Sequence, residues 1–252
     1  TPKWVVKKMV DLLEQESIDP TDWLTTVSAL EQRMDDMTEA YRRNQMKRMK
    51  QGSCSDEACI IFSELLTDFA LKYAIPVTTT LLGKGAFPES HPSGLSLGMA
   101  GMHGHPVANR ALMGADVIIA IGSRFSDRTT GNRQRFAADA KIIHIDLDAA
   151  EIDKAIETDV WLVGDASRVI EVLSEAMKKK IADHSEWNKT LAEIRTKEPM
   201  PRHEYSGEIA PWQVLETLHE LTKGEAVVTT EVGQNQMWAA QHLRVEAPRR
   251  FL

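Results

Sequence analysis

Apolar residues recur at three- and four-residue spacing along the first part of the chain, as at Val5 and Met9, and this period is typical of amphipathic helices. The pattern breaks near Pro20 and then resumes. Residues 1–50 also contain no glycine. We therefore predict a helical N-terminal segment over residues 1–52. We interpret its basic end, RRNQMKRMK, as a solvated helix terminus that the helix dipole favours, in preference to a binding patch.

Beyond Gly52 the pattern changes to short apolar runs that alternate with helical segments. Strands are predicted at 75–80, 117–122, 141–147 and 160–164. Helices are predicted at 55–73, 105–114, 149–156 and 166–181. Buried β-branched runs separated by helices are typical of parallel sheets. We therefore predict an α/β fold with a doubly wound parallel sheet over residues 53–185, preceded by the helical segment.

The chain then becomes polar, with Pro199 and Pro201, and we predict a linker over residues 186–210. A helix at 211–222 follows it. The final string, AVVTTEVGQNQMWAAQ, has the pattern of a strand, a glycine turn and a helix. We interpret residues 211–252 as the start of a second α/β domain that is cut short at the end of the chain.

The composition narrows the classes of function. Among the 252 residues 27% are charged, and the formal net charge is −7. An acidic surface repels a phosphate backbone, so nucleic-acid binding is disfavoured. Cys54 and Cys59 have no further cysteines or paired histidines at zinc-ligand spacing, which argues against disulfides or structural zinc and favours a reducing compartment. No apolar run approaches the ~20 residues of a membrane span. We expect a cytoplasmic protein that binds neither nucleic acid nor membrane.

The loops after the predicted strands are the candidate sites, because open parallel sheets bind ligands at the carboxyl ends of their strands. One loop carries Gly98, Gly101 and Gly104 at three-residue spacing. Glycines there would let backbone N–H groups approach an anion at the start of the next helix. Spacing alone nevertheless favours turn geometry over ligand binding.

A second loop, GSRFSDR, places Arg124 and Arg128 beside an aromatic residue at a strand end. Guanidinium groups bind phosphate oxygens in a bidentate manner, so this loop suits a phosphate or a pyrophosphate. Pairing of both arginines with Asp127 on the surface explains the same charges equally well. Both interpretations stay open at this stage.

Carboxylates follow the next two strands. Asp146 stands where nucleotide-binding sheets often keep an acid for a ribose hydroxyl, and the nearby Asp148 has the alternative role of a helix N-cap. Asp165 is likewise a candidate cap. His103 has no carboxylate or serine partner fixed by the sequence, and His144 lies within a strand, so neither receives an acid–base role. No spacing isolates a metal cage or a carboxylate pair. The residues indicate a nucleotide- or phosphate-binding α/β domain without a visible catalytic group.

Four longer strings add information that spacing cannot. They are IPVTTTLLGKGAFPESHPSGLSLGMAGMHGHPVANRAL, ADVIIAIGSRFSDRTTGN, KIIHIDLDAAEID and VVTTEVGQNQMWAAQ. In order and spacing they resemble the catalytic subunit of acetolactate synthase (acetohydroxyacid synthase), a family of thiamine-diphosphate enzymes, over about residues 53–252. The resemblance implies a central sheet domain that holds FAD, set between a pyrimidine-binding and a diphosphate-binding domain.

The resemblance also assigns cofactor residues. Those implied for FAD are Thr80, Leu81, Ala100, Gly101, Met102, His103, Gly122, Ser123, Arg124, Phe125, Arg128, Asp146, Leu147, Gly164, Asp165 and Ala166. Those implied for the phosphates of thiamine diphosphate are Val232, Gly233, Gln234 and Asn235. The family usually has His in place of Asn235 and Asp in place of Glu231. The flavin is largely structural in this family, so we infer no hydride transfer, and no catalytic residue or metal ligand is assigned.

The implied activity condenses two 2-keto acids, pyruvate with pyruvate or with 2-ketobutyrate, to acetohydroxy acids in branched-chain amino-acid biosynthesis. It is a transfer of a two-carbon acyl unit. The family's activating glutamate and its Mg²⁺ motif have no counterpart in these residues, so we expect the chain alone to be inactive. The resemblance further implies a homo-oligomer and allows a regulatory subunit.

Two alternatives stay open. One is a non-catalytic module for flavin or nucleotide binding or for assembly, and the other is a different thiamine-diphosphate-dependent decarboxylase or carboligase. The strings GMHG and SRFSDR argue against the second alternative.

Overall fold

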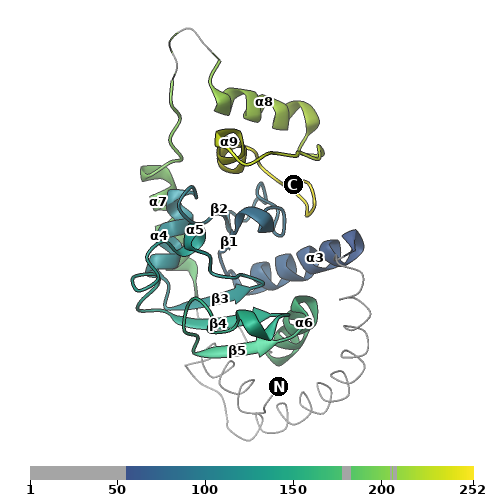
Figure 1. Ribbon diagram of the computed structural model, residues 1–252, viewed down its shortest axis with the longest axis vertical. Coiled ribbons are helices and arrows are strands. Elements are labelled where there is room, and N and C mark those ends of the chain that lie inside the picture. Colours follow the sequence, from purple (N-terminus) through teal and green to yellow (C-terminus); the bar gives the residue numbers. More distant parts are fainter. Residues whose placement is uncertain (1–54, 178–182, 205, 207–208) are drawn as a thin grey trace, which may run out of the picture. The chain divides into compact units, whose positions relative to one another are not determined.

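A computed structural model describes residues 55–177, 183–204, 206 and 209–252 (Figure 1). The predicted helical segment over 1–52 lies outside these residues. The described chain divides into two compact units. The first unit consists of residues 55–58, Asp116–Arg124 and Lys141–Asp183, and the second of Cys59–Ala115, Phe125–Ala140 and His184–Leu252.

A parallel three-stranded sheet with the order β3-β4-β5 forms the core of the first unit. Its strands are β3 (Val117–Ile121), β4 (Lys141–Asp146) and β5 (Val160–Val163). The central strand β4 is buried continuously from Ile142 to Ile145, as expected for a parallel strand covered on both faces. Helix α6 (Ala166–Ala176) contacts β4, and its Ile170 and Leu173, three residues apart, are buried.

The second unit is built around a pair of parallel strands, β1 (Val77–Thr79) and β2 (Ser96–Met99). Its helices and short helical turns are α3 (Asp56–Tyr73), η1 (Leu81–Gly83), α4 (Pro106–Gly114), α5 (Asp127–Thr130), α7 (Ser185–Lys197), α8 (Pro211–Thr222) and α9 (Gln234–His242). Helix α7 packs against α4, where Leu191 meets Val107 and Ala108 in a buried cluster with Leu97.

Helix α9 contacts both β2 and α8. Ala239 and Ala240 of α9 are buried with Met99 of β2, and Phe251 closes the same cluster. Small alanines on this face let the helix approach the strand closely. The packing therefore ties the VGQN end of the chain to the strand that precedes the GMHG loop.

The predicted α/β class with parallel strands is confirmed, and the strands fall into two sheets. Four local predictions were wrong. The predicted loop before GMHG contains β2, a helix predicted at 149–156 is only the 3-10 turn η2 (Ala149–Glu151), the predicted linker over 186–210 contains α7, and the strand predicted before VGQN is a single bridge, Val228↔Phe251.

The physical reasons differ from case to case. Glycine in the string SLGM obscured β2, and the polar surface of α7 hid a stripe of Trp187, Leu191 and Ile194 at helical spacing. The turn η2 ends where Ile152 becomes extended, with ψ at 132°, and Asp153 follows with φ at +57°. No helix within the described ranges is long and apolar enough to cross a membrane.

Candidate functional site

Three strand ends lie side by side in the first unit. The N–H of Gly122, after β3, donates to the carbonyl of Ile145 at 2.8 Å, and the N–H of Gly164, after β5, donates to the carbonyl of Asp146 at 2.9 Å. Because the strands are parallel and in register, the predicted loops meet at the same carboxyl edge. This edge is where open parallel sheets bind ligands.

At the β3 end of this edge the space over the backbone is open. Gly122 has φ at +62°, and a Cβ added there would meet no atom within 4 Å. Arg124 and Leu147 are exposed, and Arg124 forms no ion pair within the described residues. A ligand with a phosphate could therefore approach the Gly122 backbone and meet a cation there, which fits one half of a dinucleotide.

Asp146 supplies the carboxylate of the edge. Its Oδ1 accepts a hydrogen bond from the Asp148 N–H at 2.9 Å, and its Oδ2 lies 3.9 Å from Nε2 of His144. His144 is fully buried, its Nε2 lies 2.9 Å from the Ser123 carbonyl, and burial lowers its pKa. A neutral imidazole here has a structural role, as the sequence indicated, although it is fully rather than half buried.

The two other carboxylates at this edge are helix caps. Asp148 accepts from the N–H of Ala150, and Asp165 accepts from the N–H groups of Ser167 and Arg168. The alternative interpretation of both residues is thus confirmed. A carboxylate already placed at the start of α6 disfavours a phosphate at that helix end, so a role of Asp165 and Ala166 toward FAD stays a prediction.

Most backbone N–H groups of the GMHG turn in the second unit donate hydrogen bonds to acceptors within the protein. The N–H of Gly101 donates to Oδ1 of Asn109 at 2.8 Å, and Nδ2 of Asn109 donates back to the Gly101 carbonyl at 2.9 Å. The N–H of Met102 donates to the Arg128 carbonyl, and that of Gly104 to the Gly101 carbonyl. The turn geometry favoured above is observed, and the N–H groups of Gly101, Met102 and Gly104 already have protein acceptors. A role of this turn toward FAD stays a prediction.

Close packing explains the glycines of this turn. A Cβ on Gly101, where φ is +110°, would lie 2.4 Å from the Arg128 carbonyl oxygen, and a Cβ on Gly104 would lie 2.4 Å from that of Met99. Real Cβ atoms do not approach so closely, and the atoms in the way belong to the backbone. Both glycines are required by the protein's own fold.

The other predicted flavin residues of the second unit take varied positions. Phe125 is buried and packs edge-on against Phe136, with the ring centroids 6.0 Å apart, so its ring belongs to the core. Arg128 is exposed, and Asp127 accepts from its backbone N–H rather than from its guanidinium. Thr80 caps η1 by accepting from the Gly83 N–H, and Leu81 packs on the Met99 and Phe251 cluster.

A cavity of about 480 Å³ lies between the GMHG and VGQN strings within the second unit. It is lined by His103, Met200, Pro201, His203, Pro211, Trp212, Gln234, Met237, Trp238, Gln241 and His242. Gln241 Nε2 donates to the His103 carbonyl at 3.0 Å, so a side chain of α9 holds the GMHG turn. Trp212 Nε1 donates to the His203 carbonyl at 3.0 Å. Burial lowers the pKa of His242, which favours the neutral imidazole.

Sequence reasoning missed most of the residues that line this cavity. Five of them, Gln234, Met237, Trp238, Gln241 and His242, follow the spacing i, i+3, i+4, i+7 and i+8, which is one face of α9. That period was the signal that could have found them. Trp212, in the first turn of α8, had no comparable signal in the sequence.

The start of α9 has free backbone donors. Within the described chain the N–H groups of Gln234 and Asn235 meet no protein acceptor, while Oδ1 of Asn235 accepts from the Gln236 N–H at 2.8 Å. Val232, just before the helix, is 90% exposed. Exposed N–H groups at the start of a nine-residue helix fit the oxygens of a diphosphate. No group of acidic, histidine or cysteine side chains in the described residues could hold a metal ion.

Comparison with known proteins agrees with this architecture. Residues 58–173 match the family model described as thiamine pyrophosphate enzyme, central domain. Over these residues the chain is similar to the central domain of the thiamine pyrophosphate enzymes. The match includes both parallel sheets, the GMHG turn and the strand ends of the first unit.

Relatives of this central domain are similar over a longer stretch. The chain is 44% identical over 198 residues to the probable acetolactate synthase large subunit of Methanocaldococcus jannaschii, which covers 75% of this chain and 33% of the relative. It is 47% identical over 193 residues to the acetolactate synthase large subunit of Corynebacterium glutamicum, covering 75% and 30%. A chloroplastic acetolactate synthase 1 of Zea mays is 42% identical over 198 residues, covering 77% and 31%. The chain spans about a third of the length of these relatives.

Proposed function

We propose that this chain is the central part of an acetolactate synthase catalytic subunit, which condenses two 2-keto acids to an acetohydroxy acid. The observation that carries the proposal is the cavity lined by both His103 and Gln234. His103 and Gln234 stand 131 positions apart in the sequence. Their meeting at one cavity with aromatic walls suits a ligand site that the GMHG and VGQN strings share.

Thiamine diphosphate, when bound, supplies the carbanion chemistry that joins the two keto acids. The residues of this chain would contribute by binding the cofactor. The N–H groups of Gln234 and Asn235 would hold the diphosphate at the start of α9, and Trp212 and Trp238 would keep water out of the cavity. A neutral His242 would add no positive charge to the wall of the cavity.

FAD belongs to the same proposal as a bound cofactor with a structural role. In the first unit, Gly122 and Ser123 would offer backbone to the nucleotide, Arg124 would bind phosphate, and Asp146 would accept from a ribose hydroxyl. The exposure of Arg124 and the open space over Gly122 support this assignment. Homo-oligomeric assembly, a regulatory subunit and a role for Mg²⁺ are further parts of the proposal that rest on resemblance alone.

An FAD titration of the purified chain tests the flavin part, with binding followed by flavin fluorescence. Loss of a charge-assisted hydrogen bond in Arg124→Ala should weaken binding roughly tenfold or more. Asp146→Asn should weaken it less. Lys141→Ala removes an exposed cation at the opposite, amino end of β4 and should bind FAD like the parent. Absence of saturable binding, or equal loss in all three variants, would contradict the assignment.

A thiamine diphosphate titration tests the cavity separately. Trp212 and Trp238 line it, so diphosphate binding at α9 should change tryptophan fluorescence. Thiamine without phosphates should give a much smaller change, because the helix end would have no anion to bind. Trp238→Phe should reduce the signal, whereas Trp187→Phe, away from the cavity lining, should leave it intact. A response equal for thiamine and its diphosphate would argue against the helix-end site.

A further inference from the structure

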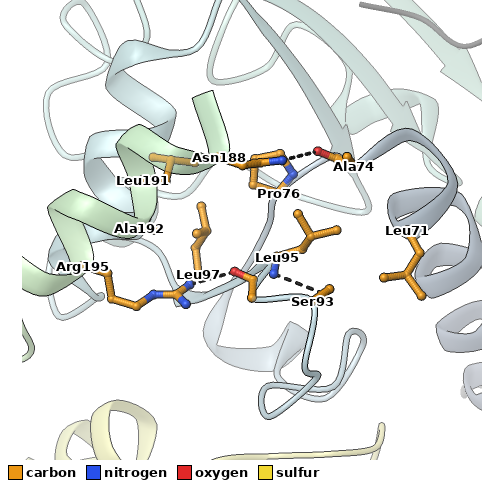
Figure 2. A pocket seen from close by; sticks show the side chains of 11 residues that line it. Leu71, Ala74, Pro76, Ser93, Leu95, Leu97, Asn188, Leu191, Ala192 and Arg195 are labelled. Atoms are coloured by element: carbon orange, nitrogen blue, oxygen red, sulfur yellow. Dashed lines mark hydrogen bonds between the residues drawn. The ribbon is translucent and has the colours of Figure 1, made fainter. Parts of the chain in front are cut away.

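A second cavity of the second unit shares no lining residue with the one at His103 (Figure 2). Its volume is about 310 Å³, the lower end of the range for ligand sites. Helix α3, the loop before β2 and helix α7 form its walls. A space of this size suits a small molecule rather than a coenzyme.

The walls are largely aliphatic, with one cation. Leu71, Leu95, Leu97 and Leu191 provide most of the apolar surface, and Arg195 reaches across the opening toward the loop before β2, as Figure 2 shows. No acidic side chain lines the cavity. Apolar walls around one fixed charge are the usual make-up of a site for an amphiphilic anion.

The guanidinium of Arg195 has hydrogen-bond donors that no protein acceptor uses. Its Nη2 donates to the carbonyls of Gly94, at 3.2 Å, and of Ser96. A guanidinium has five N–H donors, and in the described chain neither Nε nor Nη1 of Arg195 has an acceptor or an acidic partner. Burial without a neighbouring carboxylate lowers the pKa of Arg195. An anion entering the cavity would therefore meet a partly desolvated guanidinium whose Nε and Nη1 donors are available for hydrogen bonds.

Asn188 adds a second polar contact. Its Nδ2 donates to the Ala74 carbonyl at 2.9 Å, which fixes the amide on the wall of the cavity (Figure 2). The amide is neutral, so it contributes no negative charge that would favour an ammonium group. The chemistry therefore selects a carboxylate without a neighbouring amine.

We propose that this cavity binds a small aliphatic carboxylate, with its carboxylate on Arg195 and its alkyl chain among the four leucines. This site is independent of the proposed cofactor sites. Pairing with the free guanidinium donors provides the anion selectivity, and the leucine walls provide affinity that grows with chain length until the cavity is filled.

Ligand-observed NMR or calorimetry on the purified chain tests the proposal with hexanoate as the probe. Hexanoate should bind, hexanamide should bind at least tenfold more weakly, and norleucine should be weak because its ammonium has no acidic partner. Butyrate should bind more weakly than hexanoate. Equal binding of hexanoate and hexanamide would overturn the role of Arg195.

Variants separate ligand binding from the structural contacts of Arg195. Arg195→Gln should weaken hexanoate binding tenfold or more, whereas Lys189→Gln removes a cation from the exposed face of the same helix and should have no effect. Ala192→Trp fills the cavity from an exposed position and keeps Arg195, so it should abolish binding while the fold persists. Hexanoate binding that survives Ala192→Trp, or no saturable hexanoate binding to the parent chain, would refute the site.

Discussion

The GMHG turn of the second unit and the strand ends of the first unit contain the same kinds of residues in different physical states. In the turn, a Cβ on Gly101 would collide with backbone at 2.4 Å, and the N–H groups already have protein acceptors. At the strand ends, a Cβ on Gly122 would meet nothing within 4 Å, and Arg124 is exposed. A glycine-rich string can therefore serve the fold, whereas a single glycine with open space can serve a ligand.

Charged side chains of the two regions differ in the same way. Lys84 is buried, with Nζ 2.6 Å from Oε1 of Glu89 and 3.1 Å from the Ala240 carbonyl. Glu89 Oε2 accepts in turn from the Val245 N–H. The Lys84 ammonium and both carboxylate oxygens of Glu89 therefore have internal partners, and we call these residues a closed network. At the strand ends of the first unit, by contrast, the cation Arg124 is exposed to solvent.

The largest effect is expected from opening this network. Lys84→Met leaves Glu89 buried without its cation, and removing one partner of a buried pair costs about 3–5 kcal/mol. Burial already raises the pKa of Glu89, so the additional Glu89→Gln change should recover part of the loss. Arg110→Met, which breaks the exposed pair with Glu198, should cost under about 1 kcal/mol. Urea unfolding would measure all four proteins, and similar losses for Lys84→Met and Arg110→Met would contradict the contrast.

Gly101→Ala should have the next largest effect. The positive φ and the contact with the Arg128 carbonyl together should lower the free energy of unfolding by about 3 kcal/mol or more. Gly131→Ala is the matched control, because φ there is +62° and nothing lies within 4 Å of an added Cβ. Since ψ at Gly131 is −119°, outside the left-handed helical region, this change should cost about 1–3 kcal/mol from backbone strain alone, less than Gly101→Ala. Thermal or urea unfolding that ranks the two variants equally would show that the turn tolerates a side chain.

The closed region should also respond to pH through His105. Burial, helped by the charge of Lys84, lowers the pKa of His105 to about 4, and its Nδ1 accepts from the Met99 N–H. Between about pH 6.5 and 4 the unfolded chain binds the additional proton, so stability is present above 6.5 and is lost as the pH falls. The loss approaches about 3 kcal/mol at pH 4.

His105→Gln keeps an acceptor for Met99 and removes the titration. Its free energy of unfolding should therefore change less steeply over this pH range than that of the parent, in urea melts at several pH values. His203→Gln, at an exposed position, should keep the parent's slope. A parental slope in His105→Gln would show that other groups control the acid response.

The smallest effect on stability is expected at the open edge. Gly122→Ala should cost about 1 kcal/mol from its positive φ alone, yet it should weaken FAD binding because the methyl group occupies the space over the backbone. Differential scanning fluorimetry with and without FAD would separate the two effects. A large destabilisation without FAD would mean that the backbone around Gly122 is packed as tightly as that around Gly101.

The sequence predicted the parts of this picture that depend on local pattern. The β-branched runs that became β3 and β4, and the position of Asp146 after a strand, followed from periodicity. The use of each polar group did not, because Asn109 reaches Gly101 and Gln241 reaches His103 only after the chain has folded. Composition was misleading where apolar residues were sparse, as in α7.

The same limit applies to the cavity at His103. The strings GMHG and VGQN were recognisable, but their meeting depends on the packing of α9 against β2, which no local pattern encodes. The periodic face of α9 could have been found from spacing, whereas Trp212 could not. Tertiary contacts thus decided which predicted residues came together.

Hydrogen–deuterium exchange with and without FAD tests the central claim most directly, because it reports both regions in one experiment. The account predicts the strongest FAD-dependent protection in peptides covering 119–126 and 145–149. Peptides covering the interior of the closed network at 84–90 should change little, since their hydrogen bonds exist already. FAD that binds by fluorescence yet leaves both strand ends unprotected would contradict the account.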